Sequence, residues 1–421
     1  MVQENTTIFD PFLETQSKPL LIKDRHFLRP EYIPDKLPHR DQLLNQLAAI
    51  LSTALRGERP SNILIFGKTG TGKTACAKFL GKEIRRKVET DDRAKKVNYL
   101  YINCKVVDTE YGILASIANH FGKTSDDQIP FTGWPMDKVY KTLKDRVEEA
   151  RGVTVIVLDE IDQYVFKSNG DVLYHLTNLN DELKTAKVSI IGITNDSKFT
   201  ERLETRVKTR LGEENVIFPP YDAHELQDIL KDRAVLAFYD HNAALDPSVI
   251  PLCSALAAQE HGDARRALDL LRVAGELAER ETSSKVTERH VHKAKNKIEL
   301  DVQNEVIRSL PMHSKVLLLS IVLENLEGQT QLTTGEVYQV YYELCRFARV
   351  SPLTQRRITD LISELDMLGI ITATLKSFGR GGGRTRIIRM SISPSEARHI
   401  LSEDDELRRI VDYRSRQTKL F

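Results

Sequence analysis

Short apolar runs alternate with amphipathic segments between about residues 62 and 218. The runs occupy residues 63–66, 97–102, 153–158, 188–193 and 216–218. Because they are almost continuously apolar and are separated by segments with helical spacing, they predict a parallel sheet covered by helices on both faces. Pro219 and Pro220 end this α/β unit, since successive prolines cannot continue a strand ladder.

The segments around this unit have other patterns. Apolar residues recur at helical spacing in residues 41–52, and residues 221–298 are helical in pattern throughout. From about residue 302, three helical patterns precede two alternating segments, 370–376 and 384–393, which flank a glycine-rich tip. This order of helices and one hairpin is typical of a winged helix.

The pattern therefore predicts a flexible tail, an α/β nucleotide-binding domain, an all-α lid domain, a winged-helix domain and a second tail. The predicted ranges are 1–20, 21–220, 221–299, 300–410 and 411–421.

Composition narrows the class of protein. With 41% hydrophobic and 29% charged residues, the chain is typical of globular proteins, and its 421 residues suggest about two to four domains. The longest uncharged apolar run, Ile250 to Ala258, is far shorter than the roughly 20 residues of a membrane helix. The first residues lack the pattern of a signal peptide, so we expect a cytoplasmic protein with no membrane partner. The four cysteines are scattered without ligand spacing, so we expect neither a disulfide nor a metal cluster.

A phosphate-binding motif carries the clearest chemistry. Residues 67–74 match GxxxxGK[ST] and lie between a predicted strand and a predicted helix, where backbone N–H groups and the helix dipole favour an anion. Lys73 is expected to reach the β- and γ-phosphates, and the Thr74 hydroxyl to ligate Mg²⁺. The predicted cofactors are ATP or ADP with Mg²⁺. The candidate binding residues here are Gly67, Lys68, Thr69, Gly70, Thr71, Gly72, Lys73, Thr74 and Ala75.

Two strand ends carry further polar candidates. Asp159 and Glu160 follow the strand 153–158, which predicts a Mg²⁺ partner in Asp159 and a general base or water-positioning group in Glu160. Asn195 follows the next strand and is positioned to orient the attacking water. An ordinary acidic turn at 159–160 and an Asx turn at Asn195 remain the alternatives.

Three arginines are candidates for sensing the γ-phosphate. Arg265 follows Gly262, Asp263 and Ala264 at the start of a lid helix, from where it could couple nucleotide state to the domain angle. Arg206 and Arg210 precede the last strand, where an arginine can act on a neighbouring subunit's nucleotide as a finger. The alternative for Arg265 is a solvated arginine behind an Asp263 N-cap. The alternative for Arg206 and Arg210 is a solvated basic helix face, and the sequence does not separate these two arginines.

Together, the phosphate loop, the Asp-Glu pair, Asn195, the arginine before the last strand and the Gly-Asp-Ala-Arg helix resemble an AAA+ ATPase. In detail the chain resembles the archaeal replication initiators related to both the largest origin recognition complex subunit and the cell-division-cycle helicase loader. Residues 38–40, 129–135 and 218–221 and the winged helix carry this likeness, which covers roughly residues 20–400. The resemblance implies a nucleotide-contacting role for Tyr221, and a DNA-touching helical insertion within about 105–136.

Charge distribution supports DNA as a partner. No acidic residue occurs between Asp366 and Glu396, although the net charge of the chain is only +1. Cations around a glycine-rich wing suit contact with phosphates or a minor groove. Those of the wing are Lys376, Arg380, Arg384, Arg386 and Arg389.

A recognition helix is predicted before the wing, with Ser351 at its N-cap, Pro352 at its first position and Gly369 after its end. The apolar residues expected on its inner face are Leu353, Ile358, Leu361, Ile362, Leu365 and Leu368. The residues of its N-terminal turn that would face DNA are Thr354, Gln355, Arg356 and Arg357. A solvated hairpin turn and an ordinary polar helix face are the alternatives.

The sequence thus predicts a replication initiator that binds duplex origin DNA, helps recruit or load the replicative helicase, and uses slow ATP hydrolysis as a switch. Paralogous initiator subunits are further possible partners. Residues 416–421 resemble a truncated sliding-clamp peptide, with an ordinary frayed chain end as the alternative. A nucleoid-associated location would follow. The alternatives are a clamp-loader-type motor, which has no need of a basic hairpin, and a signal-transduction ATPase, which would need sensor repeats after the winged helix.

Overall fold

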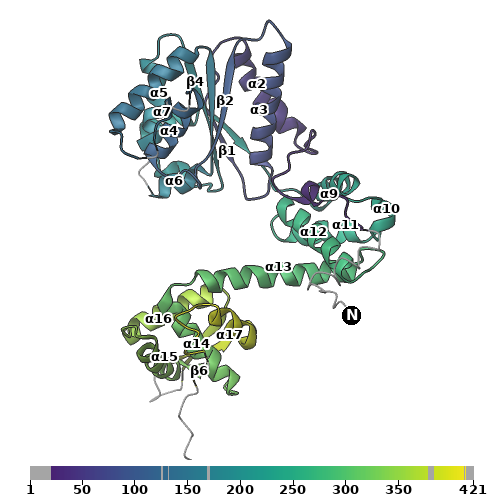
Figure 1. Cartoon of the computed structure of the whole chain (residues 1–421), viewed down its shortest axis with the longest axis vertical. Coiled ribbons are helices and arrows are strands. Elements are labelled where there is room, and N and C mark those ends of the chain that lie inside the picture. Colours follow the sequence, from purple (N-terminus) through teal and green to yellow (C-terminus); the bar gives the residue numbers. More distant parts are fainter. Residues whose placement is uncertain are drawn as a thin grey trace, which may run out of the picture. The chain divides into compact units, whose positions relative to one another are not determined.

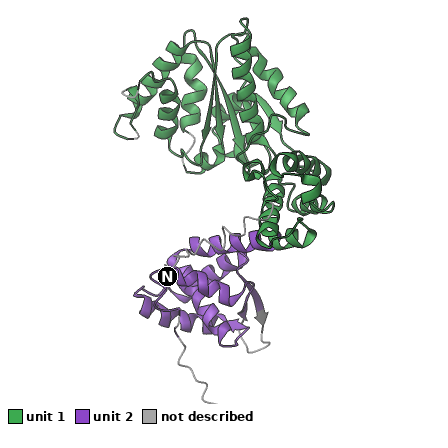
Figure 2. Cartoon of the chain, turned by 45° about the vertical axis from the view of Figure 1, so that its right-hand side comes forward, with its two compact units in different colours: residues 1–294 green, residues 295–421 purple. Residues whose placement is uncertain are grey.

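The computed structural model describes residues 20–124, 127–130, 132–167, 171–377, 384–411 and 413. The chain divides into two compact units, residues 1–294 and 295–421, coloured separately in Figure 2. Several predicted features lie outside the described residues: nearly all of the N-terminal tail, Arg380 at the tip of the wing, and the clamp-like peptide 416–421. The side chains of Lys376 and Arg384 are not described either.

Five strands of the described residues form one parallel sheet, in the order β2-β3-β4-β1-β5. They are β1 (Ile63–Phe66), β2 (Val97–Asn103), β3 (Val153–Asp159), β4 (Lys187–Thr194) and β5 (Glu214–Ile217). The predicted strands and the parallel α/β fold are confirmed. The last strand begins two residues earlier than its apolar run, because Glu214 and Asn215 pair in register with Ile63 and Leu64 of β1.

Alternate residues of β3 face two separate cores. Ile156 and Leu158 of β3 pack among residues of α4 (Glu110–His120), α5 (Met136–Ala150) and α7 (Asp171–Glu182). Val155 and Val157 pack instead with α2 (Asp41–Leu55) and α3 (Lys73–Thr90). Figure 1 shows these two helical layers on opposite faces of the sheet. Burial of both faces explains why the strands are continuously apolar.

Between residues 221 and 287, all of which the structure describes, four helices make up the lid part of the first unit. They are α9 (Ala223–Ala237), α10 (His241–Ala244), α11 (Val249–Gln259) and α12 (Ala264–Arg280). Helix α9 begins with a capping box between Asp222 and Glu225, and the Asp263 carboxylate caps α12. Residues 22–28 pack on this lid, with Ile22 N–H donating to Glu279 and Lys23 N–H to the Ala237 carbonyl. The predicted helical lid is confirmed.

The sequence predicts a domain boundary at residues 299–300. Helix α13 (Glu288–Ser309) is continuous across these residues and does not mark a boundary there, so its position stays a prediction. The second unit contains α14 (Met312–Leu326), α15 (Thr334–Ala348), α16 (Gln355–Met367) and α17 (Pro394–Ser402). Strand β8 (Arg384–Met390) lies between β6 (Leu332–Thr333) and β7 (Ile371–Ser377) in an antiparallel sheet. This arrangement confirms the winged helix.

The predicted start of the recognition helix is wrong. Helix α16 begins at Gln355, with Thr354 as N-cap, rather than at Pro352. The reason is tertiary: the Leu353 N–H donates to the Tyr341 hydroxyl at 3.3 Å, and the Tyr338 hydroxyl donates to the Leu353 carbonyl at 3.3 Å. These two bonds to α15 keep the preceding residues out of the helix.

The expected inner face of α16 also needs a correction. Ile358, Leu361, Ile362 and Leu365 are buried as expected, but Leu368 is 49% exposed. Leu368 is the C-cap, and Gly369 follows it with a φ of +71°. The helix therefore ends before Leu368 can turn toward the core.

Candidate functional site

The phosphate loop connects β1 to α3 at the edge of the sheet where the parallel strands end. Gly70 and Gly72 have φ of +70° and +91°, which a side chain tolerates poorly. Space is also limiting: a Cβ on Gly70 would lie 1.7 Å from Asp263 Oδ1, and one on Gly72 would lie 2.7 Å from the Tyr221 hydroxyl. The loop can therefore follow this path only with glycine at both positions.

Lys73 points back into the loop. Its Nζ donates to the carbonyls of Gly67 (2.7 Å) and Lys68 (2.6 Å) and to Asn195 Oδ1 (2.8 Å). Burial lowers the pKa of Lys73 to about 8; nearby Asp159 opposes this shift and Arg265 adds to it. The ammonium is thus held by exchangeable polar partners in a position where phosphate oxygens could replace them.

Asp159 is the centre of a hydrogen-bond network at the end of β3. Its Oδ2 accepts from the Thr74 hydroxyl and from the Tyr101 hydroxyl, both at 2.6 Å. Its Oδ1 accepts from the backbone N–H of Glu160 at 2.9 Å. The structure thus brings together Thr74 and Asp159, the two residues that the sequence predicts as Mg²⁺ partners, and adds Tyr101 to them.

Glu160 and Asn195 line a cavity that the phosphate loop also lines. Glu160 has a φ of +54°, an unfavourable conformation for a residue with a side chain, of the kind found at active sites. The backbone N–H of Asn195 donates to Asp162 at 3.4 Å, while its side chain accepts from Lys73. Asn195 is therefore tied both to α6 (Ile161–Lys167), the helix that follows β3, and to the phosphate loop.

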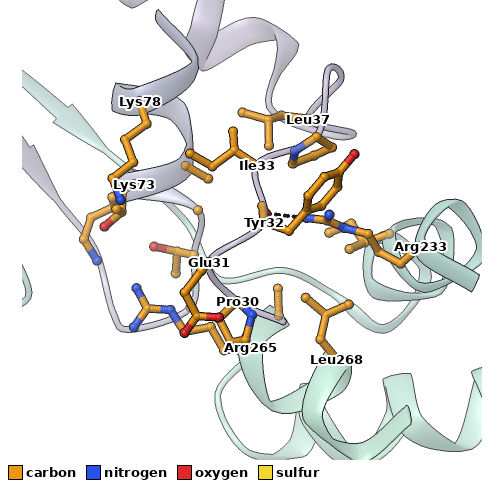
Figure 3. A pocket seen from close by; sticks show the side chains of 18 of the residues that line it. Pro30, Glu31, Tyr32, Ile33, Leu37, Lys73, Lys78, Arg233, Arg265 and Leu268 are labelled. Carbon is orange, nitrogen blue, oxygen red and sulfur yellow. Dashed lines mark hydrogen bonds between the residues drawn. The ribbon is translucent and has the colours of Figure 1, made fainter. Parts of the chain in front are cut away.

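The lid closes over the phosphate loop at the start of α12. The Ala264 N–H donates to the Gly70 carbonyl at 3.2 Å, and the Asp263 carboxylate accepts from the N–H groups of Arg265 and Arg266. The exposed Arg265 side chain lines the cavity from this helix (Figure 3). Arg265 therefore occupies a place from which a lid side chain can meet bound phosphate.

A cavity of about 450 Å³ extends from the loop between the sheet and the lid. This volume lies in the range of small-molecule sites. Away from Lys73, apolar side chains line it: Ile33, Leu37, Ile229, Leu236 and Leu268. Figure 3 shows Lys73 and Lys78 on one side and Arg233, beside Tyr32, on another. A polar end for phosphates and an apolar end for a base fit a nucleotide.

Arg40 and Tyr221 join the loop to the lid. The Arg40 guanidinium is 2% exposed and donates to the carbonyls of Thr71 (3.0 Å), His39 (3.0 Å) and Pro219 (2.8 Å). It stacks on the Tyr221 ring at 3.6 Å. Burial raises the pKa of Tyr221 to about 12. Tyr221 lines the cavity, and the nucleotide-contacting role that the family resemblance implies for it stays a prediction.

Sequence reasoning missed several lining residues. Residues 30–37 and Arg233 have no motif that would mark them. Arg233 donates from Nη2 to the Tyr32 carbonyl at 3.1 Å, and its buried Nη1 has no hydrogen-bond partner among the described residues. Three regularly spaced prolines, Pro30, Pro34 and Pro38, were the only signal in this segment, since they predict an extended rather than helical stretch.

The winged helix presents part of the predicted DNA surface. Thr354, Gln355, Arg356 and Arg357 are all exposed at the start of α16. Arg357 lies near Asp360 and Glu364 of its own helix, at 3.7 and 3.6 Å. Within the described part of the chain Arg356 has no such carboxylate partner, so its charge is the more available of the two.

Arg386 differs from its neighbours on the wing. Its Nη1 donates to the Thr359 carbonyl at 3.1 Å and to the Ser363 hydroxyl at 2.6 Å. It therefore holds β8 against α16, which makes it first a structural arginine, whereas Arg389 on the same strand is exposed.

Three family models match the chain in succession. The model for the ATPase family associated with various cellular activities (AAA) matches residues 63–215, the Cdc6 AAA+ ATPase-type lid domain matches 227–296, and the CDC6 C-terminal winged helix domain matches 305–399. The ORC1-type DNA replication protein of Thermococcus kodakarensis is 51% identical over 99% of this chain and 99% of its own. That of Pyrococcus furiosus is 52% identical over 95% of this chain and 94% of its own. The chain belongs to the ORC1-type DNA replication protein family.

Solved structures agree with this family. The Aeropyrum pernix ORC1 protein, solved in complex with DNA, is 45% identical and covers 93% of this chain with a TM-score of 0.78. The Aeropyrum pernix ORC2 protein, at 22% identity and a TM-score of 0.59, shows the shared fold. As an AAA+ protein of the ORC1 type, the chain has the machinery of a nucleotide-binding ATPase. No helix among the described residues is long and apolar enough to cross a membrane.

The two arginines before the last strand, Arg206 and Arg210, have different surroundings in this ORC1-type protein. Both lie on α8 (Thr205–Leu211). The Arg210 guanidinium donates to the Thr177 carbonyl and to Asp181, at 3.2 and 2.9 Å, and is held on α7. Arg206 is exposed and has no hydrogen-bond or ion-pair partner among the residues described. Arg206 is therefore the better placed of the two to reach another molecule.

Proposed function

We propose that this ORC1-type protein binds ATP with Mg²⁺ in the cavity between the sheet and the lid, and hydrolyses it slowly. The observation that carries the proposal is the shared lining of that cavity by the phosphate loop, Asp159, Glu160 and Arg265 of the lid. The Thr74 hydroxyl and the Asp159 carboxylate supply oxygen donors, the type that Mg²⁺ prefers. When bound, the metal would neutralise charge on the phosphates.

In this proposal the remaining polar groups divide the work of hydrolysis. Lys73 exchanges its carbonyl partners for phosphate oxygens, Glu160 activates or positions the attacking water, and Asn195 orients that water. Arg265 contacts the γ-phosphate, so that loss of this phosphate loosens the lid. A switch of this kind needs only a differential contact in the two nucleotide states.

Arg206 is proposed as the finger that acts on a neighbouring subunit's ATP, in preference to Arg210. The test is a mixing experiment. Arg206→Ala should keep ATP affinity but lose hydrolysis in assemblies, and Lys73→Ala should lose both. Mixing the two variants should restore part of the hydrolysis, because the Lys73→Ala subunit still supplies Arg206 to its neighbour. Hydrolysis by Arg206→Ala alone at the wild-type rate would refute the assignment, and Arg210→Ala is the matched control.

We further propose that the winged helix binds duplex origin DNA and that the protein helps recruit or load the replicative helicase, with paralogous subunits as possible partners. The support is the exposed start of α16 with Arg356, the exposed Arg389 on the wing, and a relative of 45% identity solved with DNA. Family membership argues against the clamp-loader and signal-transduction alternatives. A cytoplasmic, nucleoid-associated location is part of this proposal.

Duplex binding is tested by fluorescence anisotropy at about 50 and about 200 mM salt, where several phosphate contacts would change affinity by orders of magnitude. Lys73→Ala should abolish ATP binding and spare most of the DNA affinity. Equal loss of both would show that the nucleotide and DNA functions are not separable. Affinity that is no better at the lower salt would refute DNA binding. Footprinting on the protein's own genome, with ATP and then ADP, would identify the site and its dependence on nucleotide.

A further inference from the structure

Tyr101 lies on β2, the edge strand of the sheet, and its hydroxyl reaches the carboxylate of Asp159 on the neighbouring strand. In register, Tyr101 pairs with Val157, and the pair of Asp159 is Asn103. The tyrosine side chain therefore extends along the sheet toward the ends of the strands, where the phosphate loop begins. No motif in the sequence marks this residue.

Two hydroxyls share one carboxylate oxygen. Thr74 and Tyr101 both donate to Asp159 Oδ2 at 2.6 Å, which is short for a hydrogen bond between two oxygens. The other oxygen, Oδ1, is held by the Glu160 N–H at 2.9 Å. Asp159 is only 2% exposed, so water cannot readily replace a lost donor. Hydrogen bonds thus fix both oxygens of the Asp159 carboxylate, and Tyr101 helps to fix Oδ2.

We propose that Tyr101 is a positioning residue for the metal: its hydroxyl orients the Asp159 carboxylate so that this group and the Thr74 hydroxyl face Mg²⁺ together. The inference rests on the proposed function, in which Thr74 and Asp159 hold the Mg²⁺ of bound ATP. It adds a residue behind the metal ligands, which the phosphate-loop and Asp-Glu motifs do not include.

The physical reason is the need to fix a carboxylate that serves a hard, geometrically demanding cation. Mg²⁺ requires near-octahedral oxygen geometry, and partners that orient its ligands affect metal affinity by about 10–100-fold. Without the phenol, Thr74 alone would hold Oδ2 and the Glu160 N–H alone would hold Oδ1, so the Asp159 carboxylate would be fixed less tightly about its last torsion. The acceptor of the Thr74 hydroxyl would then be held less firmly as well.

The substitution Tyr101→Phe removes the hydroxyl and keeps the ring. The Tyr101 ring has its own contact, with Lys78 Nζ lying 4.5 Å from its centroid, and a phenyl ring preserves this contact. The strand also offers a matched control two residues away. The Tyr99 hydroxyl donates to the Ala77 carbonyl at 2.6 Å and makes no bond to Asp159. Tyr99→Phe thus removes an equally short tyrosine bond from the same strand without touching the carboxylate.

The experiment measures binding of a fluorescent ATP analogue to the full chain while free Mg²⁺ is titrated, and again with a chelator in place of Mg²⁺. For Tyr101→Phe we expect the half-saturating Mg²⁺ concentration to rise about 10–100-fold. Affinity in the chelator should stay at the wild-type value, because Lys73 and the loop are unchanged. Tyr99→Phe should match the wild type in both titrations, and thermal unfolding of both variants should show that they fold.

Each outcome decides something different. Wild-type protein that binds the analogue equally well with and without Mg²⁺ would refute the proposed Mg²⁺ site itself. Mg²⁺-dependent wild type with an unchanged Tyr101→Phe titration would overturn only the role of Tyr101. Equal shifts in Tyr99→Phe and Tyr101→Phe would also overturn it, since they would reflect a general loosening of β2 and not the bond to Asp159.

Discussion

Replacing Arg40 with lysine keeps the positive charge but removes a guanidinium that joins the phosphate loop to the lid. Arg40 donates to three backbone carbonyls, those of Thr71, His39 and Pro219, and stacks on Tyr221 at 3.6 Å. A lysine ammonium cannot span these directions, because it is a compact charge without the planar fork of arginine. We therefore expect Arg40→Lys to destabilise the first unit and to weaken ATP binding.

The magnitude follows from these contacts. A hydrogen bond to a charged group contributes about 1.5–3 kcal/mol, and a buried carbonyl left unpaired costs about as much again in lost solvation. Stacking of a cation on an aromatic ring adds about 0.5–2 kcal/mol. If lysine keeps one bond, and water or small shifts compensate in part, the loss is about 3–5 kcal/mol, as for other broken buried charge contacts.

Urea unfolding followed by tryptophan fluorescence measures this loss. The chain has one tryptophan, Trp134, which belongs to the first unit, so the signal does not mix in unfolding of the winged helix. The control is Arg56→Lys, because the pair of Arg56 with Glu58 at 3.8 Å is exposed on both sides and contributes little. An unfolding free energy of Arg40→Lys within about 1 kcal/mol of that of Arg56→Lys would refute the reasoning.

Three further predictions concern the loop, its lysine and the wing. Gly70→Ala should weaken ATP binding about tenfold or more, because its Cβ would lie 1.7 Å from Asp263 Oδ1 at a φ of +70°. Titration with nucleotide measures this affinity, and an unchanged affinity would contradict the prediction. Because burial lowers the pKa of Lys73 to about 8 and phosphates require the charged form, ATP affinity should fall by up to about tenfold per pH unit above that value, and stay nearly level below it. Calorimetry in buffers of different ionisation heat should show proton uptake at high pH, and no uptake would count against the assignment. In the winged helix, Arg389→Ala should lower DNA affinity and reduce the salt slope by about 1, with no loss of stability. Arg386→Ala should in addition destabilise this unit by about 1–3 kcal/mol, as its hydrogen bonds to α16 are lost; equal unfolding curves for the two variants would show that those bonds contribute nothing.

Features that depend only on residues close together in the sequence could be predicted from it. The strands are continuous apolar runs because both faces of the sheet are covered, and the phosphate loop is a local motif between a strand and a helix. Asp263 caps α12 as its position before Arg265 suggests, because a cap needs only the next two N–H groups. Local rules failed at α16, where Tyr338 and Tyr341 of another helix hold Leu353 outside the helix.

The sequence by itself determined the α/β core, the lid, the winged helix and the loop that receives phosphate, since repeated spacing and one contiguous motif carry that information. Only the tertiary structure decided which distant side chains complete the site. Arg40 meets Thr71 across 31 positions of the chain, and Tyr101 meets Asp159 across 58. Arg386 likewise turned out to bridge β8 to α16, although its charge and place on the wing suggested DNA. Such pairings depend on strand order and on how the lid packs over the loop, and neither is written in the spacing of any single segment.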